Sequence, residues 1–297
     1  MADSLDDGLQ LDDDLVAFSG DEAGSDTQEF RKETVRPEPV RDASEAKKRK
    51  RKEARKKKAA AYHDEVHAGQ AVALQPSDRQ ADFFVAQQKK TYPKLSSLEM
   101  QEHQVPAAAF VESYTFDKER TLDHLATFLQ KYAHATPDTF ADADAPWKKE
   151  HGVPRILVVT GNAQRAADLA RVLRTLLPED ESRPAKRRKG AEVSTAGGVA
   201  KLFARHFKVD EQVTHLQENA TPLAVGTPHR IQQLLERGAL RTDHLQALVV
   251  DHSWTDAKMR TIFDTPETRD ALVHLVSDAT LRKALLRKDA PCKIILY

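Results

Sequence analysis

One stretch of the chain, residues 221–254, constrains the fold more than any other. It begins with the short apolar run Pro222–Val225, which has the length and composition of a buried strand. After a glycine come Thr227 and Pro228, which are favoured at the N-cap and at the first position of a helix. The stretch therefore predicts a strand that passes directly into a helix, with the hydroxyl of Thr227 as the cap.

The rest of this stretch predicts the helix itself and a second strand. Gly238 is expected to end the helix, because glycine commonly follows the last helical turn. The apolar run Leu245–Val250 is short enough for a buried parallel strand and stops at Asp251. One face of the helix carries apolar residues at helical spacing: Ile231, Leu234 and Leu235. Residues 221–254 are thus expected to form a strand–helix–strand unit.

Alternating strands and helices are expected on both sides of this unit. The further expected strands are Pro154–Thr160, one near Val213–Leu216, and Cys292–Tyr297. The expected helices are 78–89, capped by Ser77 or Asp78; 117–133, capped by Asp117; 163–177; one after Gly198 that carries Leu202, Phe203 and Phe207; 266–276; and 279–287. Such alternation predicts an α/β fold with three layers, in which helices cover both faces of a mostly parallel sheet.

The charges of the chain are segregated, although its formal net charge is zero. Residues 1–30 contain ten Asp and Glu and no Lys or Arg, whereas Lys47–Lys58 contains ten Lys and Arg and one Glu. A polar acidic segment with isolated apolar residues cannot offset its ordering entropy, so we expect 1–46 to be a disordered tail. The tail could dock on a basic protein surface or serve only for solubility.

These patterns divide the chain into three parts. The acidic tail 1–46 is followed by a basic and helical extension over 47–104 and by a globular domain over 105–297, whose core is expected to begin near Val105. The charged, proline-containing segment 179–190 predicts an exposed insertion in that domain.

Two basic clusters are candidate RNA contacts. A run of this kind suits nuclear import, neutralisation of nucleic-acid phosphates, or a solvated charged helix. The first cluster consists of Lys47, Lys48, Arg49, Lys50, Arg51, Lys52, Arg55, Lys56, Lys57 and Lys58. The second, in the insertion, consists of Lys186, Arg187, Arg188 and Lys189.

Several protein classes are not favoured. The chain has no run of about 18 apolar residues and no charged-then-apolar opening, so we expect a soluble protein that is not secreted. The lone Cys292 excludes an intramolecular disulfide framework and a cysteine-based zinc site. Glycine fingerprints for cofactors, a nucleophile elbow and a zinc-binding pair of histidines on one helical face are not found, so we expect no cofactor and no metal.

Several segments resemble, in the same order, motifs of the first RecA-like domain of DEAD-box RNA helicases. Residues 225–231, VGTPHRI, stand where that family has ATPGRL, and residues 248–254, LVVDHSW, stand where it has LVLDEAD. Residues 154–162, PRILVVTGN, match its Ia motif, and Gly197 and Gly198 its glycine pair. The resemblance spans roughly residues 114–297 and implies a RecA-like domain, related to P-loop NTPases.

A narrower resemblance is to the complementation-of-Mcm-ten-suppressor family of nucleolar proteins. It rests on the charged tail, the basic run, and the segments RAADLARVL, KLFARHFKVDEQ and VGTPHRI. It implies association with early small-subunit pre-ribosomes.

The departures from the helicase motifs remove parts that ATP chemistry requires. A phosphate-binding loop needs glycines, a Lys and a Ser or Thr, but no glycine occurs between Gly69 and Gly152. Asp251 is kept, but His252 stands where the helicases have their catalytic Glu. The sequence also stops before a second RecA-like domain. We therefore expect no enzyme activity and no catalytic residue.

The residues that remain at this motif have alternative roles. His252 is either a base or a hydrogen-bonded structural residue, the commoner role for a His at the end of a buried strand. Trp254 either stacks on a base or packs into the vacated nucleotide cleft. Asp251 could cap the following loop.

The helicase property that these departures leave in place is contact with the RNA backbone. Thr227, Pro228 and Arg230 match a Thr-Pro-Gly-Arg motif that touches RNA phosphate in the helicases, and the first amides of a helix offer an anion site. The same turn could equally serve only to stabilise the fold. The same ambiguity holds for Gly197 and Gly198. Asn162 and Arg165, near the turn that matches the Ia motif, are further candidates.

We therefore expect a nuclear, nucleolar and non-catalytic ribosome biogenesis factor of the small-subunit processome. Its expected partners are pre-rRNA or small nucleolar RNA and processome proteins, with no membrane and no small-molecule substrate. One alternative is an RNA-stimulated ATPase or helicase-like enzyme that a partner completes. Another is a chromatin or replication-linked interaction module.

Overall fold

The computed structural model describes residues 72–141, 149–178, 198–205 and 207–297. All of them belong to one compact unit of the chain, Glu53–Tyr297. The acidic tail, both basic clusters and the insertion 179–190 lie outside the described residues, so the boundaries of the three parts stay predictions.

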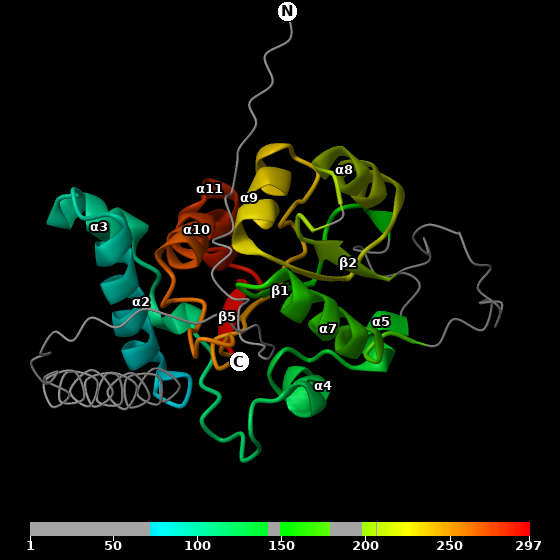
Figure 1. Cartoon of the computed structure of the whole chain (residues 1–297), viewed down its shortest axis with the longest axis horizontal. Helices are drawn as coiled ribbons and strands as arrows, with labels where there is room; N and C mark the ends of the chain where they lie inside the picture. The colour runs from blue at the N-terminus through cyan, green and yellow to red at the C-terminus, as the bar shows by residue number, and fades with distance from the viewer. Residues whose placement is uncertain (1–71, 142–148, 179–197, 206) are drawn as a thin grey trace, which may run out of the picture. The chain divides into compact units, whose positions relative to one another are not determined.

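A five-stranded sheet forms the centre of the domain (Figure 1). Its strands are β1 (Ile156–Val159), β2 (Val199–Leu202), β3 (Leu223–Gly226), β4 (Ala247–Val250) and β5 (Lys293–Leu296). They lie in the order β2-β3-β1-β4-β5, and every pair of neighbours is parallel. The predicted α/β fold is therefore confirmed, and the sheet is compatible with a RecA-like domain.

Helices surround the sheet (Figure 1). They are α2 (Ser77–Thr91), α3 (Ser97–His103), α4 (Leu122–Tyr132), α5 (Pro137–Ala141), α7 (Ala163–Arg174), α8 (Val209–Glu218), α9 (Pro228–Glu236), α10 (Pro266–Ser277) and α11 (Ala279–Leu285), with the short 3-10 helix η1 (Ala107–Ala109). The predicted helices in the regions of α7, α9, α10 and α11 are confirmed within a few residues at their ends.

Two cores lie on opposite faces of the sheet. Along β1, Leu157 and Val159 belong to one core, and Ile156 and Val158 to the other. Successive side chains of a strand point to opposite faces, so a strand buried on both sides is apolar throughout. The first core is completed by side chains from α2, α8, α9, α10 and α11, and the second by side chains from α4, α5 and α7. The sheet is thus the middle of three layers.

Two predictions between residues 198 and 216 are wrong. The segment after Gly198, expected to be a helix, is strand β2, and the strand expected near 213–216 lies inside α8. Because β2 has only four residues and Lys201 interrupts its apolar run, the sequence does not resemble a buried strand. Gln212 and Leu216 are buried one helical turn apart, which is the spacing of a helix packed on one side.

Helix starts also differ from the predictions. α2 has no side-chain cap, because its N-cap residue is Pro76, which offers no side-chain acceptor. Ser77 is already the first helical residue, and its backbone N–H and hydroxyl donate to Glu112, each at 3.1 Å. α4 begins after Thr121, later than expected. Thr227 does occupy the N-cap of α9, but its hydroxyl makes no capping hydrogen bond.

The core reaches further towards the N-terminus than expected. Ala73, Ala81 and Phe84 are buried in the same core as Leu248 of the central sheet. α2 also packs against α10 and η1. The core therefore begins before Val105.

Candidate functional site at the carboxyl edge of the sheet

Ligands of open α/β sheets bind outside the carboxyl ends of the strands, where the strand order reverses. After β1, the chain forms β2 and β3 on one side of it and then β4 and β5 on the other. The reversal therefore lies between β1 and β4. Val159 is paired with Val250 in these strands, which places the following residues, Thr160 and Asp251, side by side at the crevice.

Asp251 holds three side-chain hydrogen bonds at this crevice. Its Oδ2 accepts from Thr160 Oγ1 at 2.9 Å and from Arg165 Nε at 3.0 Å. Its Oδ1 accepts from Arg165 Nη2 at 3.1 Å. The side chains of Arg165 and Asp251 are 8% and 1% exposed, so water hardly reaches this bidentate ion pair. Arg165 thus neutralises the aspartate that the helicase motif would direct towards magnesium.

Trp254 lies on the same arginine. The guanidinium carbon of Arg165 is 5.8 Å from the centre of the Trp254 ring, within the range of a cation–π contact. Trp254 is only partly buried. It therefore packs over the Arg165–Asp251 pair and still keeps part of its surface accessible to solvent.

His252 is enclosed by aromatic side chains. Its ring centre lies 5.6 Å from those of Phe83 and Phe263. Its backbone N–H donates to the carbonyl oxygen of Tyr297 at 2.7 Å, but its Nδ1 has no hydrogen-bond partner among the described residues. Burial, with a smaller contribution from the positive charge of Arg120, lowers the pKa of His252 from 6.5 to about 4. The ring is therefore neutral at physiological pH and is held by packing.

Residues 106–121, which the helicase resemblance would align with a phosphate-binding loop, are joined to β5. Phe110 forms a parallel bridge with Ile294, and the N–H of Val111 donates to the carbonyl oxygen of Ile294 at 2.9 Å. This segment thus runs beside the strand and leads into the loop before α4.

Arg120 fixes that loop. Its guanidinium donates to the carbonyl oxygens of Leu296, of Ala73 at 3.1 Å and of Ser113 at 3.3 Å. Burial lowers the pKa of Arg120 to about 10, so the group stays charged at neutral pH. A phosphate cradle presents backbone N–H groups to an anion. Here, instead, carbonyl oxygens from the loop, from β5 and from the segment before α2 point towards the cationic side chain of Arg120.

The β3–α9 turn is built for close packing. A Cβ atom on Gly226 would lie 2.1 Å from the carbonyl oxygen of Leu202, so only glycine fits there. Arg230 is 7% exposed and donates from Nη1 to the carbonyl oxygen of Phe207 at 3.1 Å and to Gln212 Oε1 at 2.7 Å. Burial lowers the pKa of Arg230. Arg230 therefore braces α9 against α8.

The other candidates on helicase-like motifs have separate positions. Asn162 caps α7, because its Oδ1 accepts from the N–H groups of Gln164 and Arg165 at 2.7 and 3.2 Å. Gly198 directly precedes β2. Gly197 and the residues of both basic clusters lie outside the described residues, so RNA contact by any candidate stays a prediction.

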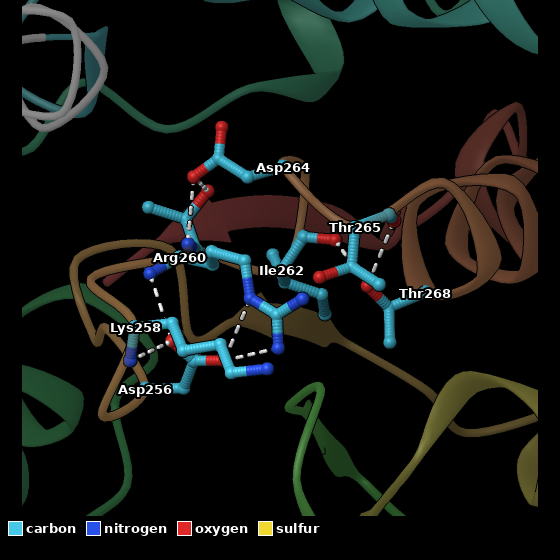
Figure 2. A network of polar contacts seen from close by, with 8 residues as sticks. Asp256, Lys258, Arg260, Ile262, Asp264, Thr265 and Thr268 are labelled. Carbon is cyan, nitrogen blue, oxygen red and sulfur yellow. Dashed lines mark hydrogen bonds and ion pairs between the residues drawn. The ribbon is translucent and has the colours of Figure 1, made fainter. Parts of the chain in front are cut away.

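The loop after Trp254 is held by a polar network (Figure 2). Asp256 accepts from the backbone N–H groups of Lys258 and Arg260 at 2.7 and 2.9 Å, and from the Arg260 guanidinium at 2.7 and 2.9 Å. Asp264 accepts from the N–H and the hydroxyl of Thr261, both at 2.7 Å. These bonds fix the course of the loop from Trp254 towards α10.

Within the described residues, no cluster of three or more His, Cys, Asp or Glu side chains is arranged to hold a metal ion. The helices in these same ranges are too short or too polar to span a bilayer.

The sequence predicted neither the Arg165–Asp251 pair nor the role of Arg120. The signal for the pair was present: an Arg in the first turn of the helix after β1, and an Asp at the end of a strand beside β1. Recognising it required the strand order. No local pattern marks Arg120, because two of its acceptors, the carbonyl oxygens of Ala73 and Leu296, come from segments far along the chain.

Comparison with known proteins identifies the family. Residues 26–297 match the model of the CMS1 family, described as a U3-containing 90S pre-ribosomal complex subunit. The chain belongs to this family. A relative from Chaetomium thermophilum, Protein CMS1, is 34% identical over 256 residues, which cover 86% of this chain and 94% of that protein. The narrower family resemblance drawn from the sequence is therefore confirmed.

More distant relatives share the family name. Protein CMSS1 of Xenopus laevis is 28% identical over 64% of this chain and 58% of its own length. Protein cms1 of Schizosaccharomyces pombe is 23% identical over 78% of this chain and 74% of its own length. Family membership associates the chain with ribosome biogenesis as part of a pre-ribosomal complex.

Proposed function

We propose that the chain is a non-catalytic docking subunit of the early small-subunit pre-ribosome, in the nucleolus, and that it contacts pre-rRNA or assembly proteins through its domain surface and basic segments. The observation that carries the non-catalytic part is the Arg165–Asp251 ion pair. An aspartate whose two oxygens already accept three hydrogen bonds inside the protein, two of them from an arginine that neutralises its charge, keeps little capacity to orient a hydrated magnesium ion.

Two further features support this proposal. The guanidinium of Arg120 donates to three carbonyl oxygens at the place where an ATPase would present backbone N–H groups to a phosphate. His252 is neutral and enclosed by phenylalanines, so it has no access to a nucleophilic water. The carboxyl edge of the sheet therefore supports docking to a partner without a nucleotide better than it supports ATP hydrolysis.

A calorimetric titration of the full chain with ATP and magnesium tests the non-catalytic part. We expect no saturable binding. Saturable affinity in the micromolar range would contradict it. Phosphate release by the purified chain, with and without pre-ribosomal RNA, tests the alternative of an ATPase completed by a partner.

Sedimentation of tagged chain from a nuclear extract tests the docking part. We expect the chain to co-sediment with U3 RNA in a pre-ribosomal particle. Recovery with chromatin proteins and without pre-rRNA would instead favour the replication-linked alternative.

RNA contact through the basic run follows from its charge density. Replacing the ten Lys and Arg of Lys47–Lys58 with Gln should weaken RNA binding and flatten its dependence on salt, because fewer counterions are released. The matched comparison is the same replacement at Lys186–Lys189, which should have a smaller effect. Equal affinity and equal salt dependence in all three proteins would place the RNA contact elsewhere.

A further inference from the structure

The carboxyl edge of the sheet presents a partly exposed tryptophan on a fixed support. Trp254 lies over Arg165, Arg165 is held by both oxygens of Asp251, and Asp251 is held by Thr160. The aromatic ring is thus supported from within the protein, at the point in the sheet where ligands of such folds bind.

The loop that continues from Trp254 is equally well fixed. Asp256 accepts hydrogen bonds from the backbone N–H groups of Lys258 and Arg260 and from the Arg260 guanidinium, as Figure 2 shows. A ring and a loop that are already ordered lose little conformational entropy when a partner binds.

The charges at this platform indicate what kind of group would bind. The positive charges of Arg165 and Arg260 are balanced by Asp251 and Asp256. A site neutralised in this way favours an uncharged planar group over an anion. Lys258 is exposed in the same loop and could contact a phosphate next to that group.

We propose that Trp254 is a stacking platform for an unpaired base of single-stranded RNA, with Arg165 as the residue that positions the ring. Bases stack on aromatic side chains with little regard to sequence, and each stack contributes on the order of 1–3 kcal/mol. This proposal rests on the docking function above and assigns it a contact residue. Among planar partners we choose a base because the family is described as part of a U3-containing complex.

Fluorescence of the full chain tests the stacking. The sequence contains two tryptophans, so a Trp147→Phe background leaves Trp254 as the single emitter. Addition of a short single-stranded RNA should quench this emission. The same strand with abasic sites should bind more weakly and quench less. Binding without quenching, or equal quenching by the abasic strand, would overturn the proposal.

Affinity measurements on variants complete the test. Trp254→Ala should weaken RNA binding about tenfold, whereas Trp254→Phe should keep most of the affinity, since a phenyl ring still stacks. Met259→Ala, an exposed side chain in the same loop, is the matched control and should change nothing. Unchanged affinity in Trp254→Ala overturns the stacking role. If Trp254→Ala does not fold, the Phe variant and the quenching decide.

Failure of this proposal is distinguishable from failure of the docking function. A chain that binds RNA independently of Trp254 but still sediments with the pre-ribosome refutes only the stacking. A chain that does not sediment with the particle refutes the docking itself.

Discussion

Two buried arginines at the same edge of the sheet are held in different ways. Arg165 has a charged partner, Asp251, whereas Arg230 donates to a backbone carbonyl and to a side-chain amide oxygen. The Nε of Arg230 has no acceptor among the described residues. The first arginine is neutralised by a carboxylate at the crevice, and the second braces two helices through hydrogen bonds from its guanidinium to uncharged acceptors.

The comparison shows that a motif can be kept in the sequence while its side chains are buried and inaccessible to a ligand. VGTPHRI keeps most of a helicase RNA-contact pattern, yet Arg230 within it is buried in helix packing. DHSW departs most from its helicase counterpart, yet it supplies the partly exposed Trp254. Substitutions in the two regions should therefore affect the stability of the fold and the recognition of a partner separately.

The largest effect should come from Asp251→Ala. It leaves the buried Arg165 without a charge partner, which costs about 3–5 kcal/mol of unfolding free energy. Chemical denaturation of the full chain measures this. Asp210→Ala removes an exposed partner of Arg237 and should cost less than about 1 kcal/mol. Similar losses in both variants would mean that the Arg165–Asp251 pair is hydrated.

Lowering the pH should reduce the free energy of unfolding through the protonation of His252, which follows β4. Its folded pKa of about 4 lies below its ordinary value of 6.5, so the unfolded chain binds the proton more tightly. The stability it contributes, about 3 kcal/mol, is complete above pH 6.5 and is lost as the pH falls towards 4. Denaturation at a series of pH values, compared with His252→Phe, isolates this contribution from that of the carboxylates. Parallel pH profiles for the two proteins would refute it.

Gly226→Ala tests close packing in the β3–α9 turn. The new Cβ atom would lie 2.1 Å from the Leu202 carbonyl oxygen, so β2 or α9 has to shift at a cost of about 3 kcal/mol. Gly238→Ala is the matched control, because nothing lies within 4 Å of its Cβ position and only its φ of +66° opposes the change. That variant should lose about 1 kcal/mol in the same denaturation experiment. The reverse ranking would show that backbone conformation, and not contact, selects these glycines.

Arg230→Met should have the smallest effect, about 2 kcal/mol, because it removes two hydrogen bonds from the guanidinium to uncharged acceptors and keeps much of the side-chain volume. The RNA affinity of this variant, measured under conditions where it is fully folded, shows whether Arg230 braces the two helices or contacts an RNA phosphate. Unchanged affinity fits a brace. A clear loss would restore Arg230 to the RNA interface.

The sequence predicted the layers of the fold because they depend on local patterns. Runs such as Leu245–Val250 can be read without knowing what they pack against. Strand β2 could not be read in this way, because Lys201 lies within four residues that become a strand only by pairing with β3. Arg120 and Arg165 were out of reach for a related reason, since the partners of each lie far along the chain and meet it only through tertiary structure.

The bridge between Phe110 and Ile294 closes the β5 side of the sheet. An open edge strand offers unpaired N–H and C=O groups to any other chain, which leads to strand addition or aggregation. Here the backbone N–H of Val111 donates to the carbonyl oxygen of Ile294, and the Nζ of Lys293 donates to the carbonyl oxygen of Ala108 at 2.6 Å. Growth of the sheet in this direction is therefore blocked, so a protein partner on the β5 side has to recognise side chains and loops and cannot simply extend the sheet there.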